Sequence, residues 1–103
     1  MSERLDELLR FVELMPQDPF PLYGLALEYR SLGKFAEAAA TFERLQSGHP
    51  AYVPQYLMYG KLLAAELGDT QKAKAVLQLG VQKAQQAGNR HALGELMSEL
   101  EAL

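Results

Sequence analysis

Residues 19–50 read PFPLYGLALEYRSLGKFAEAAATFERLQSGHP, and apolar side chains recur along them at the spacing of an amphipathic helix. Asp18 and Pro19 are typical of the N-cap and the first residue of a helix, and Gly33 is typical of the residue that follows one. Ser47 to Pro50 interrupt the second apolar run. The segment therefore predicts two helices joined by a tight turn. They are expected to bury Leu22, Leu25, Ala26, Tyr29, Leu32, Phe35, Ala38, Ala39, Phe42 and Leu45.

The rest of the chain also has a helical pattern. Ser2 and Pro16 bound a first helix, and no run of four or more residues alternates between apolar and polar side chains as a half-buried strand does. Six helices with short turns predict an all-α fold of antiparallel neighbours. The later helices are expected over residues 54–67, 70–87 and 89–102, and the last of them is expected to turn Leu93, Leu96, Met97 and Leu100 inward.

The two central helix pairs repeat each other. Gly33 and Gly68 lie 35 residues apart at the ends of the first helices, and Pro19 and Pro54 have the same separation at their starts. These positions determine how two helices pack, which favours a duplicated helical hairpin. The same shift superposes Leu22 on Leu57, Leu32 on Leu67, Ala38 on Ala73 and Phe42 on Leu77, and it places Leu57, Gly60, Leu63, Ala64 and Leu67 in the core.

With these matches the chain resembles the tetratricopeptide repeat family, whose unit is a helix-turn-helix of about 34 residues. In the second copy, Tyr59 and Gly60 resemble the family's step from a large to a small residue. Gly60 lies eight residues before Gly68, one more than the family pattern has, which implies an extra residue in the helix or a shifted phase. The first copy carries the pattern at Leu22, Leu25, Ala26, Tyr29, Gly33, Phe35, Ala38, Phe42, Leu45 and Pro50, and the second at Leu57, Gly60, Leu67, Gly68, Ala73 and Leu77.

The resemblance is to a small bacterial-type protein with two repeats and flanking helices. It implies a single domain over residues 1–103, built as a right-handed superhelix of antiparallel helix hairpins. An N-terminal packing helix over residues 1–16 and a C-terminal capping helix over residues 89–103 would cover the two ends, as a short array requires. The repeats themselves would span residues 19–52 and 53–87.

In this family the first helix of each repeat lines a concave groove that holds a partner peptide or helix. Phe20, Tyr23 and Leu27 lie beside the predicted core stripe and are surplus to it, as expected for a binding surface. Alternatively, the first and last helices cover these three residues, which then belong to the core. Position by position, the resemblance implies a groove lined by Phe20, Tyr23, Leu27, Arg30, Gln55, Met58, Tyr59 and Leu62.

The composition argues against several other functions. The chain has no cysteine and a net charge of -3, which leaves no thiolate chemistry and no basic field for nucleic acid. His49 and His91 have no ligand-spaced histidine or carboxylate on their own helix faces, so neither a metal nor a cofactor is expected. No segment resembles a leader or a membrane-spanning helix, which makes the cytoplasm the default location.

We therefore expect a non-enzymatic interaction module whose partner is a protein or peptide, with no role for nucleic acid or membrane. The alternative is a self-associating scaffold whose homo-oligomer is the working unit. That alternative arises because the ends of a short helical array leave stacking surfaces thinly covered.

Overall fold

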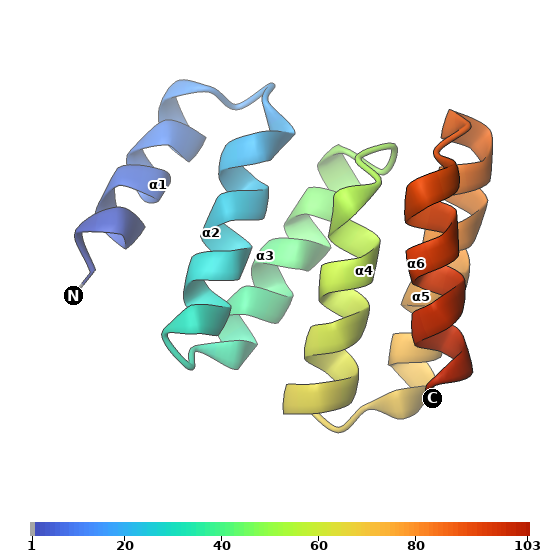
Figure 1. Cartoon of the computed structure of the whole chain (residues 1–103). Helices are drawn as coiled ribbons and strands as arrows, with labels where there is room; N and C mark the ends of the chain where they lie inside the picture. Colours follow the sequence, from blue (N-terminus) through green and yellow to red (C-terminus); the bar gives the residue numbers. More distant parts are fainter. Residues whose placement is uncertain (1) are drawn as a thin grey trace. The chain divides into compact units, whose positions relative to one another are not determined.

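The computed structural model describes residues 2–103, which form six helices and no strand (Figure 1). The predicted all-α fold is confirmed. The chain divides into two compact units, residues 1–49 and residues 50–103. That both units belong to a single domain stays a prediction. Unit 1 contains α1 (Glu3–Leu14), α2 (Pro19–Ser31) and α3 (Phe35–Gly48), and unit 2 contains α4 (Pro54–Lys61), the π-helical segment η1 (Leu62–Glu66) that continues it, α5 (Thr70–Ala87) and α6 (Arg90–Glu101).

In unit 1, α2 packs against both α1 and α3. Leu8 of α1 lies directly over Gly24 of α2, where an added Cβ would be 2.9 Å from Leu8 Cδ2. Ser2 joins the same two helices, because its hydroxyl donates to the Glu28 carboxylate at 2.9 Å and accepts the N–H of Leu5 at 3.2 Å. Ser2 is thus the N-cap that the sequence predicts. The buried apolar side chains of this unit are Leu5, Leu8, Val12, Leu22, Leu25, Ala26, Ala38, Phe42 and Leu45.

Helix α2 begins and ends as predicted. The Asp18 side chain accepts the N–H of Phe20 at 3.0 Å and so caps the first turn. Gly33 has φ +75°, a left-handed conformation that suits glycine because it has no Cβ. The N–H of Lys34 then donates to the C=O of Tyr29 at 2.8 Å, which satisfies a carbonyl of the last turn.

In unit 2, α5 packs against α4 and α6, and α4 also contacts α6. Two glycines allow α4 and α5 to approach closely. An added Cβ at Gly60 would lie 2.5 Å from Leu77 Cδ2, and one at Gly80 would lie 2.5 Å from Tyr56 Cβ. Tyr56 is fully buried, and its hydroxyl donates to the Pro50 carbonyl. The buried apolar side chains of this unit are Val53, Tyr56, Tyr59, Leu62, Leu63, Ala73, Val76, Leu77, Ala84 and Leu96.

The first helix of unit 2 contains one extra residue, which η1 accommodates. There the N–H of Leu67 donates to the C=O of Leu62, five residues back, at 3.1 Å. The N–H of Asp69 donates to the C=O of Leu63, six residues back, at 2.8 Å, whereas the bond that closes α2 spans five residues. Such π turns are rare insertions in α-helices. Of the two explanations left open by the sequence, the extra residue is therefore correct.

This insertion changes the register between the repeats. Leu57 is only half-buried, while its neighbour Tyr56 is fully buried. The repeats are therefore 34 residues apart before η1 and 35 apart after it, as Gly33 and Gly68 show. The predicted superposition of Leu22 on Leu57 is wrong, because it was anchored on the glycines and counted through the inserted residue. The equivalent core residues are Leu22 and Tyr56, Leu25 and Tyr59, and Ala26 and Gly60. Tyr29, which is half-buried, is equivalent to the buried Leu63.

Of the other residues expected in the core, three are exposed, namely Leu32, Leu67 and Met97, and six are only half-buried, namely Tyr29, Phe35, Ala39, Ala64, Leu93 and Leu100. Leu32 and Leu67 are exposed, because each is the last residue before the glycine that ends its helix. Ala64, within η1, is half-buried. The last buried residue before the glycine is Ala26 in α2 and Leu63 in η1.

Candidate functional site

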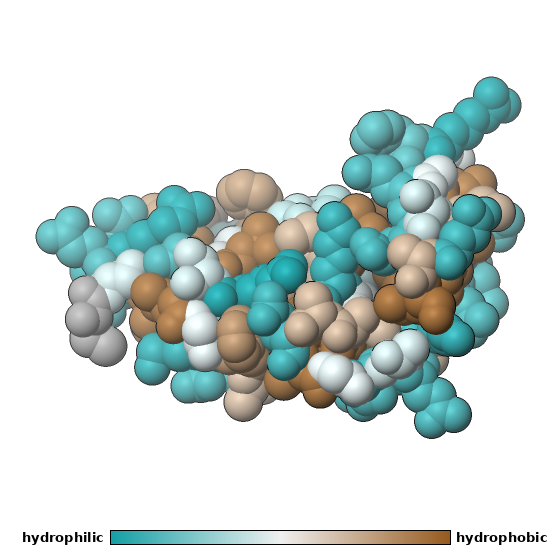
Figure 2. Space-filling view, turned by 60° about the horizontal axis from the view of Figure 1, so that its bottom comes forward, coloured by the Kyte–Doolittle hydropathy of each residue, from teal (hydrophilic) through white to brown (hydrophobic). Residues whose placement is uncertain are grey.

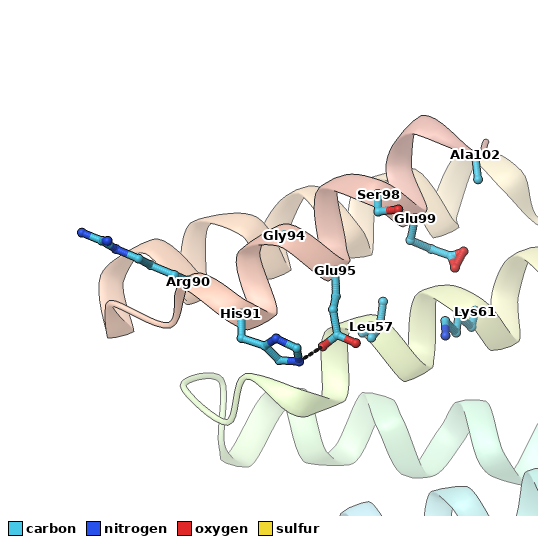
Figure 3. A pocket seen from close by; sticks show the side chains of 9 residues that line it. All are labelled: Leu57, Lys61, Arg90, His91, Gly94, Glu95, Ser98, Glu99 and Ala102. Atoms are coloured by element: carbon cyan, nitrogen blue, oxygen red, sulfur yellow. Dashed lines mark ion pairs between the residues drawn. The ribbon is translucent and has the colours of Figure 1, made fainter.

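A groove of about 620 Å³ runs between α4 and α6 in unit 2 (Figure 3). Helix α4 contributes Leu57 and Lys61 to its wall. Both side chains are half-buried, so part of each is available to a ligand. The other wall is one side of α6, lined by Arg90, His91, Gly94, Glu95, Ser98, Glu99 and Ala102.

The π segment determines which residues of α4 face this groove. With repeats 34 residues apart before η1, Leu57 corresponds to Tyr23 of α2 and Lys61 corresponds to Leu27. The groove therefore lies on the surface of the first repeat helix that Tyr23 and Leu27 occupy in unit 1. Of the expected groove residues of unit 2, Gln55, Met58 and Leu62 are displaced from this surface by one position and Tyr59 by two.

Small residues on α6 make the hollow. Gly94, Ser98 and Ala102 are spaced four apart and form one row along the helix. A Cβ added at Gly94 would have no atom within 4 Å, so the space beside it is open. A peptide backbone can approach α6 closely along this row, since no large side chain stands in the way.

The charges at the groove are mixed. His91 Nε2 lies 3.3 Å from Glu95 Oε1, one turn further along α6, and Figure 3 shows this pair facing α4. The statement that neither histidine has a carboxylate on its own helix face is therefore wrong for His91. Both side chains are at least half exposed, so the pair adds little to stability. Lys61 and Glu99 project from opposite walls, while Arg90 points away from the groove (Figure 3).

Two solved structures are similar to this chain over most of its length. A crystal structure of a tetratricopeptide repeat domain protein from Salinibacter ruber is 34% identical, has a TM-score of 0.75, and aligns over 81% of this chain and 92% of its own. A solution NMR structure of a tetratricopeptide repeat domain protein from the same organism is 33% identical, has a TM-score of 0.79, and aligns over 84% and 87%. The chain belongs to the tetratricopeptide repeat family. No protein-family model and no curated protein matches the sequence.

The predicted groove residues of this tetratricopeptide repeat protein differ in exposure. Phe20 is 63% exposed, and neither Tyr23 nor Leu27 is buried, so none of the three is an ordinary core residue. Arg30 and Met58 are half-buried as well. The remaining predicted groove residues, Gln55, Tyr59 and Leu62, are buried and offer a partner almost no surface.

Sequence reasoning missed Leu57, Lys61 and the side of α6 that faces them. Leu57 was counted as core because of the one-residue error in register. The row of small residues on α6 carries a signal, because glycine inside a helix is unfavourable unless the position needs space. Gly94 is such a glycine inside a helix. Only the packing of α6 beside α4 shows that the space beside it belongs to the groove between these two helices.

The described residues offer little for metal or cofactor chemistry. No three or more His, Cys, Asp or Glu side chains come together among residues 2–103 in a way that could hold a metal ion. None of the helices in this part of the tetratricopeptide repeat chain is both long and apolar enough to span a bilayer. Burial raises the pKa of the Tyr56 phenol, but its hydroxyl serves the core of unit 2 and not the groove.

Proposed function

We propose that this protein is a non-enzymatic interaction module that binds a partner peptide or helix on the exposed surface of the first helix of each repeat. Membership of the tetratricopeptide repeat family supports a role in protein interaction in general. The observation that carries the specific proposal is the groove between α4 and α6. It lies on the same surface of the repeat helix that Tyr23 and Leu27 occupy in unit 1.

The lining of the groove favours a short segment that presents its backbone. Gly94, Ser98 and Ala102 leave room for a main chain to lie along α6, and Leu57 gives an apolar contact on the opposite wall. Lys61 can donate to a carbonyl or carboxylate of the ligand. A segment with one apolar side chain and charges of both signs therefore fits this groove best.

In unit 1 the proposed contact surface consists of Phe20, Tyr23, Leu27 and Arg30. Phe20 is the most exposed of the four, and the other three are half-buried. Tyrosine and large apolar side chains supply contact area at a small entropic cost.

The groove is tested by filling it. Gly94→Leu places a side chain in the open space beside α6, whereas Gly94→Ala adds only a methyl group. Both changes remove a helix-interior glycine, so each should stabilise the fold by up to about 1 kcal/mol. We expect random peptides displayed on phage to be enriched by the wild type and by Gly94→Ala, and the enriched peptides to lose binding to Gly94→Leu.

Two outcomes contradict this proposal. One is the absence of any enriched peptide on the wild type. The other is enrichment of peptides that bind Gly94→Leu as tightly as the wild type. Lys74→Glu, on the exposed surface of α5, controls for a change of charge outside the groove. Lys61→Glu should weaken the same peptides that Lys74→Glu leaves unchanged.

The surface of unit 1 has its own test. Tyr23→Ala combined with Leu27→Ala should abolish capture of the partner while the helical circular dichroism stays nearly unchanged. Unfolding of this double variant would show instead that the two side chains hold unit 1 together. Phe20→Ala separates the two roles, because Phe20 is 63% exposed and its loss should not disturb the core.

A further inference from the structure

The two walls of the groove between α4 and α6 carry opposite charges. Helix α4 contains one charged residue, Lys61, which lines the groove. On the other wall, Arg90 points away from the groove, while Glu95 and Glu99 project toward α4 (Figure 3). His91 stands beside Glu95 and adds a positive charge only when it is protonated. One wall is therefore basic and the other is acidic.

Two of these charges have no partner in the part of the chain that the structure describes. Across residues 2–103, the side chains of Lys61 and Glu99 take part in no hydrogen bond and no ion pair. Glu95 differs, because its Oε1 lies 3.3 Å from His91 Nε2. A ligand that fills the groove removes water from Lys61 and Glu99, which costs free energy unless it brings the opposite charge to each. The groove therefore needs a ligand with a positive and a negative group.

The spacing of residues along the walls fits an extended segment. Leu57 and Lys61 are four residues apart on α4. Glu95 and Glu99 are also four apart on α6, so each pair is separated by about 6 Å along its helix. In an extended chain, side chains two residues apart point to the same side at a distance of about 6.6 Å, and the side chain between them points to the opposite side. An extended ligand can thus turn two alternate side chains to Leu57 and Lys61, and the one between them to α6.

We infer that the ligand of this groove is an extended segment in which a basic residue stands between an apolar and an acidic one. The apolar side chain lies on Leu57, and the acidic one accepts hydrogen bonds from Lys61. The lysine or arginine between them points to α6 and donates to the Glu99 carboxylate, with Glu95 one turn away. The inference rests on the proposed function, because it names the ligand class of the same groove. It holds for either direction of the segment, since the basic residue stays in the middle.

Segments with only one kind of side chain match these walls less well. An acidic segment brings like charges to Glu95 and Glu99, and a basic segment brings a like charge to Lys61. An apolar segment covers Lys61 and Glu99 and leaves both without an opposite charge. The alternating segment is the one that gives each wall the charge it needs.

Apolar contact alone does not select this groove. Apolar side chains reach the surface between hydrophilic ones on the face that Figure 2 draws. Large hydrophobic side chains are exposed in both units, as Leu14 at 68% and Met97 at 50% show. An apolar side chain of a ligand thus has several places to lie, whereas the opposed charges of Lys61 and Glu99 belong to the groove. Charge therefore gives the groove its selectivity.

Two phage libraries test the order of the charges. Both display random residues around a fixed triplet, which is Leu-Arg-Asp in the first library and Leu-Asp-Arg in the second, so the composition is equal and the order differs. We expect the wild-type protein to enrich peptides from the first library that lose binding to Gly94→Leu. Exchange of the two charged residues within such a peptide should weaken its binding about tenfold, because two exposed charge pairs are replaced by like charges.

The outcomes separate this inference from the proposed function. Groove-binding peptides are those that the wild type binds and Gly94→Leu does not. Equal enrichment of such peptides from both libraries, or enrichment from the second library alone, overturns the inference while the proposed function stands. The absence of groove-binding peptides from both libraries overturns the two together.

Single changes on α6 give a matched control. Glu99→Gln should weaken binding of the enriched peptides by about two- to fivefold, as expected for one exposed charge pair. Glu101→Gln removes the same charge from an exposed residue of α6 that does not line the groove, and it should leave binding unchanged. Equal effects of the two variants contradict the position given to the basic residue.

An exchange of charge between the walls tests the order directly. The variant that combines Lys61→Glu with Glu99→Lys should enrich peptides from the second library in preference to the first. Its circular dichroism should match that of the wild type, because neither side chain holds another described residue in place. A folded variant that keeps the wild-type preference overturns the inference.

Discussion

The hairpin of α2 and α3 and the hairpin of α4 and α5 fill their cores differently. In unit 1 the equivalent positions on the two helices carry Leu22 and Leu45, which are both buried. In unit 2 they carry Tyr56 and Gly80, and the tyrosine packs directly on the glycine. Two leucines thus occupy these positions in one hairpin, while in the other a large residue packs on a glycine that lets the two helices approach closely. The comparison teaches that the same repeat positions can be close-packed by different pairs of residues when the spacing of the helices changes with them.

Gly80→Leu has the largest expected effect on this comparison. Its Cβ would lie 2.5 Å from Tyr56 Cβ, a clash that no side-chain rotation relieves. We expect the free energy of unfolding to fall by about 3 kcal/mol or more in urea titrations followed by circular dichroism. The matched control is Gly94→Leu, where nothing lies within 4 Å and no loss is expected.

Tyr56→Phe tests the polar part of the large side chain. Loss of the hydrogen bond to the Pro50 carbonyl should cost about 1 kcal/mol at neutral pH. Burial raises the pKa of Tyr56 above its ordinary value of 10.0, so the folded state favours the protonated phenol. That contribution is complete below pH 10 and is lost as the pH rises through the folded-state pKa. Above pH 10 the unfolding free energy of the wild type should fall more steeply than that of Tyr56→Phe, and parallel curves would contradict the assignment.

The two hairpins also differ where their second helices begin. Asp69 caps α5 by accepting the N–H of Lys72 at 3.1 Å, whereas the equivalent residue before α3, Lys34, makes no side-chain cap. The backbone is nearly the same, with φ −91° and ψ 70° at Lys34 and φ −99° and ψ 76° at Asp69. We expect Lys34→Asp to stabilise the protein, and Asp69→Ala to destabilise it, by about 1 kcal/mol each in thermal unfolding. A Lys34→Asp variant no more stable than the wild type would show that the backbone likeness is not sufficient.

Deletion of Ala65 has the smallest expected effect. It removes the inserted residue of η1, so that the residues between Leu63 and Leu67 match in number those between Tyr29 and Leu32. We expect an uninterrupted α-helix and an unfolding free energy within about 1 kcal/mol of the wild type. Amide NMR shifts of Leu57 and Tyr56 should hardly move, because both lie before the deletion. Large shifts there would show that the π segment helps to orient the groove.

Much of the fold could be predicted because its signals are local. The caps at Ser2 and Asp18 and the glycine at Gly33 follow from the chemistry of helix ends, and each is found where it was expected. The spacing of Gly60 and Gly68 indicates the extra residue in the second repeat. Its accommodation as a π turn could not be predicted, since a bond to the fifth residue back needs no special residue type. The residues that line the groove could not be predicted either, because the error of one residue in the repeat register placed Leu57 in the core in the place of Tyr56.

The π segment also bears on how such chains change length during evolution. A residue gained in the middle of a repeat helix would normally rotate everything after it by about 100° and misplace the next hairpin. Here the widened turn at Leu62–Glu66 absorbs that rotation within the helix, so the glycine that ends it and the hairpin after it keep their places. The gap in an alignment of the two repeats therefore belongs inside the helix, between Leu63 and Leu67, and not in the turn where gaps are usually put.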